Sequence, residues 1–268
     1  SDARTSYDTL NDIISQPAER PSGHQFLERP ALSGKIEFQD VTFTYPGADI
    51  PALDKVSFKI EPGEKIAIIG RIGSGKSTIT KLMLRLYEPD SGTILIDGID
   101  IAQLDPADLR RSMSYVPQDI HLFKGTLKEN IISSERHPSD EEVIRASIVS
   151  GAYEFVHTHP KGYDMPIGER GAGLSGGQRQ SVGVARALLG SADIMLMDEP
   201  SNSMDQTTEG QLINHLKDEL RDKTMILVTQ KLTLLDLADR VMVMHHAKLI
   251  LDGPKEEVTN KLRGGSNV

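Results

Sequence analysis

The sequence contains no cysteine and no tryptophan, and aromatic residues make up only 4% of it. Without cysteine there are no disulfide bonds and no thiolate metal sites, which suits a reducing compartment. Long apolar runs are also missing. The longest apolar stretches, such as residues 66–69, are far shorter than the ~20 residues that a membrane helix needs. No segment resembles a signal peptide. We therefore expect this chain to be soluble.

Basic residues are outnumbered by acidic ones, and the formal net charge is −9. This balance argues against a broad nucleic-acid-binding face, so nucleic acid is not the expected partner. The share of apolar residues, 38%, and of charged residues, 26%, is ordinary for a globular protein. A length of 268 residues suffices for one large α/β domain with a substantial core.

Residues 70–77 read G-R-I-G-S-G-K-S and match the phosphate-binding template G-x-x-x-x-G-K-[ST]. In this template glycines turn backbone N–H groups toward phosphate oxygens, Lys76 adds a positive charge, and Ser77 offers a hydroxyl to magnesium. An apolar run at 65–69 precedes the loop, and a helical pattern from 76 to about 86 follows it. This strand, loop and helix are the context that the motif requires, so we predict a nucleotide site.

A second glycine-rich string, L-S-G-G-Q at 174–178, precedes a helical run at 178–189. It predicts another anion-binding helix start. Taken alone, the first string occurs in many unrelated NTPases and the second suits a flexible surface loop. Their occurrence together, in this order and about a hundred residues apart, argues against a chance match.

Together the two strings resemble the Walker A loop and the LSGGQ signature of the ATP-binding cassette (ABC) family, and the resemblance covers residues 35–262. It implies a P-loop NTPase fold of the ABC ATPase type: α/β, with a RecA-like parallel sheet core, an antiparallel β subdomain and an α-helical signature subdomain. In that family two domains pair head to tail, and each ATP lies between the loop of one and the signature of the other. The implied cofactors are ATP and Mg²⁺, and the implied partner is a second copy, held through ATP.

The patterns of apolar residues agree with this fold. Alternation at 36–45 and 56–60 predicts antiparallel strands. Later apolar runs separated by helical stretches predict a parallel α/β sheet. The runs lie at 193–198, 224–229 and 240–245, and the helical stretches lie at 205–219 and 231–238. Between the two halves, 117–189 reads as mostly helical, and Ser139 with Glu142 forms a capping box.

The resemblance also implies catalytic roles. Asp198 and Glu199 end an apolar run, and in the family the first supports Mg²⁺, mainly through water, while the second is the general base for the attacking water. Such a pair is often only a solvated turn, but its place after the signature and before Pro200 favours function. Gln118 matches the Q-loop, whose amide reaches Mg²⁺ and the water and whose loop faces the membrane partner, although Val-Pro-Gln alone is only a turn.

Two further positions carry roles implied by the family. Tyr45 matches the aromatic residue that stacks on adenine, although a tyrosine in a strand is usually a packing residue. Asp205 occupies the D-loop, which lies across the dimer, and it also suits the N-cap of the next helix. The full implied set for nucleotide binding is Tyr45, Arg71, Gly73, Ser74, Gly75, Lys76, Ser77, Thr78, Leu174, Ser175, Gly176, Gly177, Gln178 and Asp205. The metal set is Ser77, Gln118 and Asp198, and the catalytic set is Lys76, Gln118, Glu199 and Gln230.

One position departs from the family. Thr229, Gln230 and Lys231 stand where these ATPases nearly always have Thr-His-Arg or Thr-His-Lys. The family histidine contacts the γ-phosphate, whereas a glutamine offers a neutral amide and cannot become a cation. None of the eight histidines lies elsewhere in this loop. We therefore predict that ATP binds and that its hydrolysis is slow.

The segments at 168–173 and 178–180 resemble exporters with a fused membrane domain, and those at 231–237 and 252–255 look most like bacterial type I secretion ATPases. This resemblance implies a polypeptide cargo, a transmembrane domain of the same transporter as partner, and a place at the cytoplasmic face of the bacterial inner membrane. Residues 1–34 are then a helix and linker from a missing transmembrane domain. The helix is predicted from the spacing of Tyr7, Leu10, Ile13 and Ile14. A flexible tail is expected at 263–268.

Other functions stay open at this point. The motor of a lipid or drug exporter carries the same motifs, and a regulatory ATP-binding module would fit the loss of the histidine. Retention of Lys76, Gln118, Asp198 and Glu199 argues against complete loss of catalysis. A DNA-repair cassette needs a long coiled-coil insertion between the two strings, for which there is no room, and a translation factor usually carries a second cassette.

Overall fold

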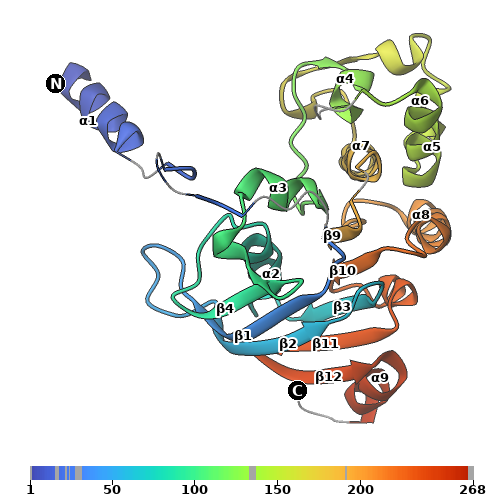
Figure 1. Ribbon diagram of the computed structural model, residues 1–268. Helices are drawn as coiled ribbons and strands as arrows, with labels where there is room; N and C mark the ends of the chain where they lie inside the picture. The colour runs from blue at the N-terminus through green and yellow to red at the C-terminus, as the bar shows by residue number, and fades with distance from the viewer. Residues whose placement is uncertain are drawn as a thin grey trace.

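A computed structural model describes residues 2–15, 18–21, 23, 25–27, 32–132, 137–190 and 192–264. Figure 1 shows an antiparallel sheet stacked on a central sheet, with a helical region to one side and helix α1 projecting away. Residues 265–268 of the expected tail lie outside the described ranges, and helix α9 (Lys255–Gly264) reaches into its first two residues. Within the described ranges, no helix has both the length and the apolar character required to cross a membrane.

The first sheet is antiparallel throughout, in the order β2-β1-β4-β5. Its side chains alternate between the interior and solvent, as the sequence predicted, and the rings of Phe38 and Phe58 stack with centroids 4.4 Å apart. The apolar face shares one core with the central sheet. The strands are β1 (Ile36–Phe43), β2 (Leu53–Ile60), β4 (Ser91–Ile96) and β5 (Ile99–Asp100).

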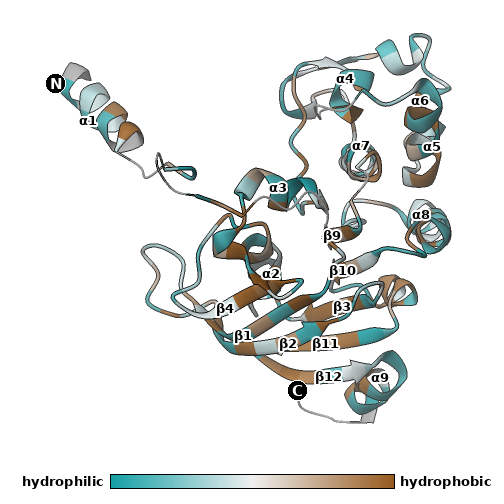
Figure 2. Cartoon of the chain, viewed as in Figure 1, coloured by the Kyte–Doolittle hydropathy of each residue, from teal (hydrophilic) through white to brown (hydrophobic). Residues whose placement is uncertain are grey.

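The central sheet has the order β12-β11-β3-β10-β9-β6, and only β12 runs antiparallel to its neighbour. The prediction of a parallel α/β sheet is therefore confirmed. Its inner strands are mostly apolar because both faces of the sheet are covered. In Figure 2 this appears as hydrophobic colouring along β3, while α8 and α9 are largely hydrophilic. The strands are β3 (Lys65–Gly70), β6 (Met113–Val116), β9 (Ile194–Asp198), β10 (Thr224–Val228), β11 (Arg240–His245) and β12 (Lys248–Pro254).

Helices around the central sheet differ slightly from the predicted ones. Helix α2 (Lys76–Met83) ends three residues before the expected position, because Arg85 takes a left-handed conformation with φ 51°. Helix α8 spans Gln206–Glu219, α3 spans Pro106–Arg111, and the stretch expected at 231–238 is a 3₁₀ helix, η4 (Leu232–Leu237).

The helical region has its own core, formed by residues such as Leu127, Val143 and Val182. Three helices of the described residues start in capping boxes, and the one predicted from Ser139 and Glu142 is confirmed. The elements are β7 (Gly125–Thr126), α4 (Leu127–Ile131), α5 (Asp140–Ser150), α6 (Tyr153–Val156), β8 (Pro166–Ile167) and α7 (Gly176–Leu188). Short 3₁₀ helices lie at Ile101–Gln103 (η1), Gly162–Asp164 (η2) and Glu169–Gly171 (η3).

The predicted N-terminal helix is present as α1 (Asp2–Ile14). Its apolar side chains Tyr7, Leu10 and Ile14 are 57–79% exposed. After it, Arg110 at the end of α3 forms an ion pair with Glu19. The helix therefore leaves an apolar stripe uncovered, while part of the following linker is tied to the domain.

Candidate functional site

The phosphate loop joins β3 to α2, as the motif requires, and its shape depends on glycine. Gly70, Gly73 and Gly75 have φ of 153°, 78° and 100°. A Cβ on Gly75 would lie 2.3 Å from the carbonyl oxygen of Ala52, whereas the space around Gly73 is open. The loop is thus pressed against the core on one side and free on the other.

Lys76 lies across this loop with only 6% of its surface exposed. Its Nζ donates to the carbonyl oxygens of Gly70 and Arg71, both at 2.8 Å. Burial lowers its pKa, and the negative charges of Glu199 and Asp198 counteract that effect. A buried cation is therefore held where a phosphate chain would meet the loop.

The end of β9 brings two buried carboxylates to the same site. Asp198 is 2% exposed and Glu199 is 5% exposed. Burial raises the pKa of Asp198, a hydrogen bond from Ser77 lowers it, and the neighbouring Glu199 raises it. Among the described residues, neither Asp198 Oδ1 nor Glu199 Oε1 has a hydrogen-bond partner. Buried carboxylate oxygens without a partner are costly, and a hard cation with its water would satisfy them. Ser77 and Asp198 thus fit Mg²⁺.

Glu199 is held in an unusual backbone conformation, with φ 48°. Its N–H donates to Val228 O (2.8 Å), and its carbonyl oxygen accepts from Gln180 Nε2 (2.9 Å). Its Oε2 accepts from Thr229 Oγ1 at 3.2 Å, so that Oε1 is the carboxylate oxygen without a partner in the described part of the chain. A strained residue fixed by several contacts is typical of a functional position.

Sequence reasoning missed Gln180, which is 3% exposed and lies on α7. Besides donating to Glu199, it accepts from the Ser203 N–H at 3.3 Å. It thereby joins the signature helix to the backbone of Glu199 and to the loop that follows β9. A polar residue on the buried face of a helical run is the signal in the sequence that could have found it.

The signature forms the start of α7, as predicted. Ser175 is the N-cap, and it exchanges two hydrogen bonds with Gln178, at 2.9 and 3.2 Å. A Cβ on Gly176 would lie 3.0 Å from Ser203 Cβ, and one on Gly177 would lie 2.9 Å from Ser203 O. The two glycines therefore allow close packing against the loop that follows β9.

An open cavity of about 530 Å³ lies in front of this helix start and is lined by the signature and by Asp205. Asp205 is the N-cap of α8, where its carboxylate accepts from the N–H groups of Thr207 and Thr208. The hydrogen bond from the Thr208 backbone lowers the pKa of Asp205. The signature belongs to the helical region and the phosphate loop to the sheet core (Figure 1).

The remaining predicted residues contact α2 or follow the carboxyl ends of central strands. Tyr45 contacts α2 through its hydroxyl, 3.2 Å from Thr78 Oγ1, and Lys81 Nζ lies 5.3 Å from the centre of its ring. Gln118 follows β6, and Gln230 follows β10; both are exposed. The structure thus brings Lys76, Ser77, Asp198 and Glu199 into one buried site.

Comparison with known proteins places the chain in one family. Residues 53–202 match the family model described as ABC transporter. The leukotoxin translocation ATP-binding protein LktB of Mannheimia glucosida is 38% identical over 255 residues, which are 95% of this chain and 36% of that protein. The ATP-dependent lipid A-core flippase of Methylobacillus flagellatus is 39% identical over 248 residues, which are 92% of this chain and 42% of that protein.

A solved structure of a bacterial Atm1-family ABC exporter with ATP bound superposes with a TM-score of 0.88 at 31% identity. The match covers 97% of this chain and 45% of that one. This chain therefore spans less than half the length of the proteins that it matches.

Proposed function

The chain belongs to the ABC transporter family, and we propose that it is the ATP-binding and ATP-hydrolysing motor domain of an exporter. One observation carries this proposal: two buried carboxylates with unpartnered oxygens, Asp198 and Glu199, share a site with Lys76 and Ser77. This is the charge pattern that phosphoryl transfer to water requires.

Each residue then has a distinct task. Backbone N–H groups of residues 71–75 and the Lys76 ammonium bind the phosphate oxygens. Ser77 and Asp198 would hold Mg²⁺, which when bound neutralises phosphate charge. Glu199 Oε1, the free atom of its carboxylate, orients a water and accepts its proton. The Gln118 amide reaches Mg²⁺ and the attacking water, and the Tyr45 ring stacks on the adenine.

The second half of the site is proposed to come from another copy. Ser175 and the N–H groups at the start of α7 face an open cavity and suit a phosphate. We infer a dimer in which two ATP molecules are sandwiched, each between one phosphate loop and the partner's signature. Sizing with ATP and Mg²⁺, compared with ADP, is expected to show an ATP-dependent dimer of an Glu199→Gln variant, in which the nucleotide persists.

Hydrolysis is proposed to be slow because Gln230, exposed after β10, cannot supply a cation. Turnover of the Gln230→His variant is expected to exceed that of the parent by up to 10²–10³-fold, roughly the effect of one oxyanion donor. Equal rates would remove this part of the proposal, and Glu199→Gln serves as the inactive control. An ATP-dependent dimer without turnover in either the parent or the histidine variant would favour a regulatory module.

We propose a polypeptide as the cargo, supported by the likeness of 231–237 and 252–255 to type I secretion ATPases and by the leukotoxin relative. The flippase relative is equally similar and supports a lipid as the second candidate. The complete transporter, reconstituted in vesicles, separates the two, since only the true cargo class is expected to stimulate its ATPase. Stimulation by lipid A alone would overturn the polypeptide proposal.

The motor is proposed to act at the cytoplasmic face of a bacterial inner membrane, joined to a transmembrane domain of the same transporter. The uncovered stripe of α1, with Tyr7, Leu10 and Ile14, suits a helix that continues from such a domain. The coding sequence that precedes residue 1 provides the test, and six membrane-length apolar segments are expected there. Their absence would contradict this assignment.

A further inference from the structure

We propose that Glu209, on the first turn of α8, is a positioning residue that fixes two catalytic loops relative to one another. The first, the β9 loop, comprises residues 199–205 and carries the Glu199 carboxylate. The second, the β10 loop, comprises residues 229–233 and carries Gln230. The proposal rests on the proposed ATPase function, and it concerns a residue that none of the sequence motifs includes.

The carboxylate of Glu209 contacts both loops. Its Oε2 accepts from Ser201 Oγ at 2.6 Å and from Lys231 Nζ at 2.5 Å, while Oε1 accepts from Thr233 Oγ1 at 2.6 Å. Lys231 Nζ also donates to Ser201 O at 2.8 Å. One side chain therefore joins a residue of the β9 loop to two residues of the β10 loop.

This network is buried and charged. Glu209 is 6% exposed, and the Lys231 side chain is 31% exposed. Burial alone would raise the pKa of Glu209, but hydrogen bonds from Lys231, Ser201 and Thr233 outweigh it and leave the pKa below its ordinary value. Glu209 is consequently ionised at neutral pH, and its contacts are charge-assisted.

The network continues to the catalytic carboxylate. The Lys231 N–H donates to Thr229 Oγ1 at 3.0 Å, and Thr229 Oγ1 donates to Glu199 Oε2 at 3.2 Å. Release of Lys231 from Glu209 is expected to loosen Thr229, and with it the orientation of Glu199. The path runs from Glu209 to the Lys231 ammonium, along the Lys231 side chain to its backbone N–H, and through Thr229 to Glu199. A disturbance at Glu209 therefore reaches the Glu199 carboxylate without touching the nucleotide.

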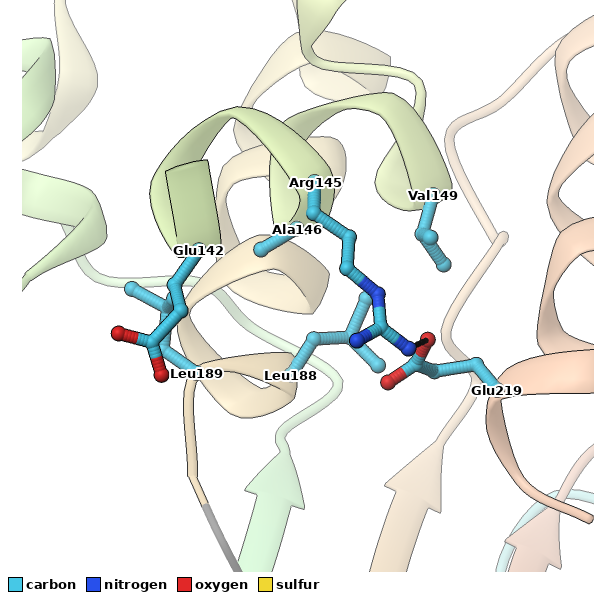
Figure 3. A pocket seen from close by; sticks show the side chains of 7 residues that line it. All are labelled: Glu142, Arg145, Ala146, Val149, Leu188, Leu189 and Glu219. Atoms are coloured by element: carbon cyan, nitrogen blue, oxygen red, sulfur yellow. Dashed lines mark hydrogen bonds and ion pairs between the residues drawn. The ribbon is translucent and has the colours of Figure 1, made fainter. Parts of the chain in front are cut away.

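A second ion pair of α8 supplies a matched control. Glu219, at the other end of the helix, pairs with Arg145 of α5 at 2.7 Å. Figure 3 shows this pair beside a small cavity of about 80 Å³, which is also lined by Leu188 and Val149. The Arg145 side chain is 72% exposed, and the ion pair joins α8 to α5 at the end of the helix far from Glu209. Glu219→Gln thus removes an acidic residue and an ion pair from the same helix, away from the loops.

The test compares the parent with Glu209→Gln, Lys231→Met, their double variant, Lys231→Arg and Glu219→Gln. Turnover at saturating ATP is expected to fall about tenfold in Glu209→Gln, with the affinity of the monomer for a fluorescent ATP analogue unchanged. The double variant is expected to be no slower than the slower single variant, because the two residues act as one unit. Lys231→Arg retains the charge and the donors and is expected to keep most of the activity.

Hydrogen exchange provides a readout that does not depend on turnover. In Glu209→Gln the amides of Asn202 and Met204 and those of the β10 loop are expected to exchange faster together, whereas Glu219→Gln leaves them unchanged. Turnover of Glu209→Gln within twofold of the parent, strictly additive losses in the double variant, or faster exchange in only one loop would each overturn the proposal. A parent that binds ATP but never hydrolyses it would instead overturn the proposed function, and the exchange experiment would still decide the role of Glu209.

Discussion

The phosphate loop and the signature both place glycines at the start of a helix, yet different parts of the chain hold them. Gly75 is pressed against the carbonyl oxygen of Ala52, next to β2 of the sheet core. Gly177 is pressed against the carbonyl oxygen of Ser203, in the β9 loop. The first loop is therefore shaped by the core, and the second by a loop that also carries the Glu199 carboxylate.

Their charges differ as well. The phosphate loop has the Lys76 ammonium across it and two buried carboxylates beside it. The signature offers neutral groups, the Ser175 hydroxyl and backbone N–H groups, and the side chain of Gln178 is already engaged in the capping box. We expect the phosphate loop to bind nucleotide within one copy and the signature to act only once a second copy is present.

Replacement of Lys76 by Ala is expected to have the largest effect on this contrast. Loss of a buried, hydrogen-bonded charge from a phosphate site costs about 2–5 kcal/mol, or at least about 30-fold in affinity. Titration of the monomer with a fluorescent ATP analogue measures it. Lys217→Ala, which removes an exposed lysine of α8, is the control and is expected to bind like the parent. An affinity of Lys76→Ala within threefold of the parent would contradict the assignment of binding to this loop.

Replacement of Gly177 by Ala tests the packing of the signature. The added methyl group would lie 2.9 Å from Ser203 O, so α7 and the β9 loop must separate, at about 1–3 kcal/mol. Turnover is expected to fall about tenfold, while nucleotide affinity of the monomer stays unchanged.

Gly210, in the second turn of α8, is the matched control for this substitution. A Cβ there has nothing within 4 Å, so Gly210→Ala is expected to keep the turnover and to raise the unfolding free energy by about 0.4–1 kcal/mol. If both alanine variants keep full turnover, the signature does not depend on its packing against Ser203.

Local sequence patterns predicted much of this molecule because they involve neighbouring residues. The phosphate loop needs only a strand, glycines and a helix start, and the capping box of Ser139 with Glu142 needs residues three apart. The parallel pairing of the central sheet followed from the alternation of apolar runs and helices, whereas the order of its strands was not predicted.

The connections between motifs could not be predicted in this way. Gln180 and Glu209 are polar residues that the helical spacing places on the apolar faces of their helices, but the pattern gives no partner for either of them. Their burial depends on what the fold brings beside them, namely the carbonyl oxygen of Glu199 in one case and Lys231 in the other. Such partners lie 19 and 22 residues away, which no short periodicity reveals.

The smallest expected effect concerns stability and sharpens the contrast in charge. Burial raises the pKa of Asp198 in the folded chain, Glu199 adds to the rise, and Ser77, Lys81 and Lys76 oppose it. Between the unfolded and the folded pKa the native state binds more protons, so the parent loses stability as pH rises through that window. The Asp198→Asn substitution removes this penalty. At neutral pH without Mg²⁺, its free energy of unfolding is expected to exceed that of the parent by about 0.5–2 kcal/mol.

Denaturant unfolding at a series of pH values measures this effect. The difference between Asp198→Asn and the parent is expected to be absent below the unfolded pKa of the carboxyl group, to grow through the window, and to be constant above it. Mg²⁺ with ATP is expected to stabilise the parent more than the variant, because only the parent offers the cation a carboxylate at this position. Parallel stability profiles for the two chains would show that the buried carboxylate of Asp198 is not under electrostatic strain, and the contrast in charge with the signature would then rest on Lys76.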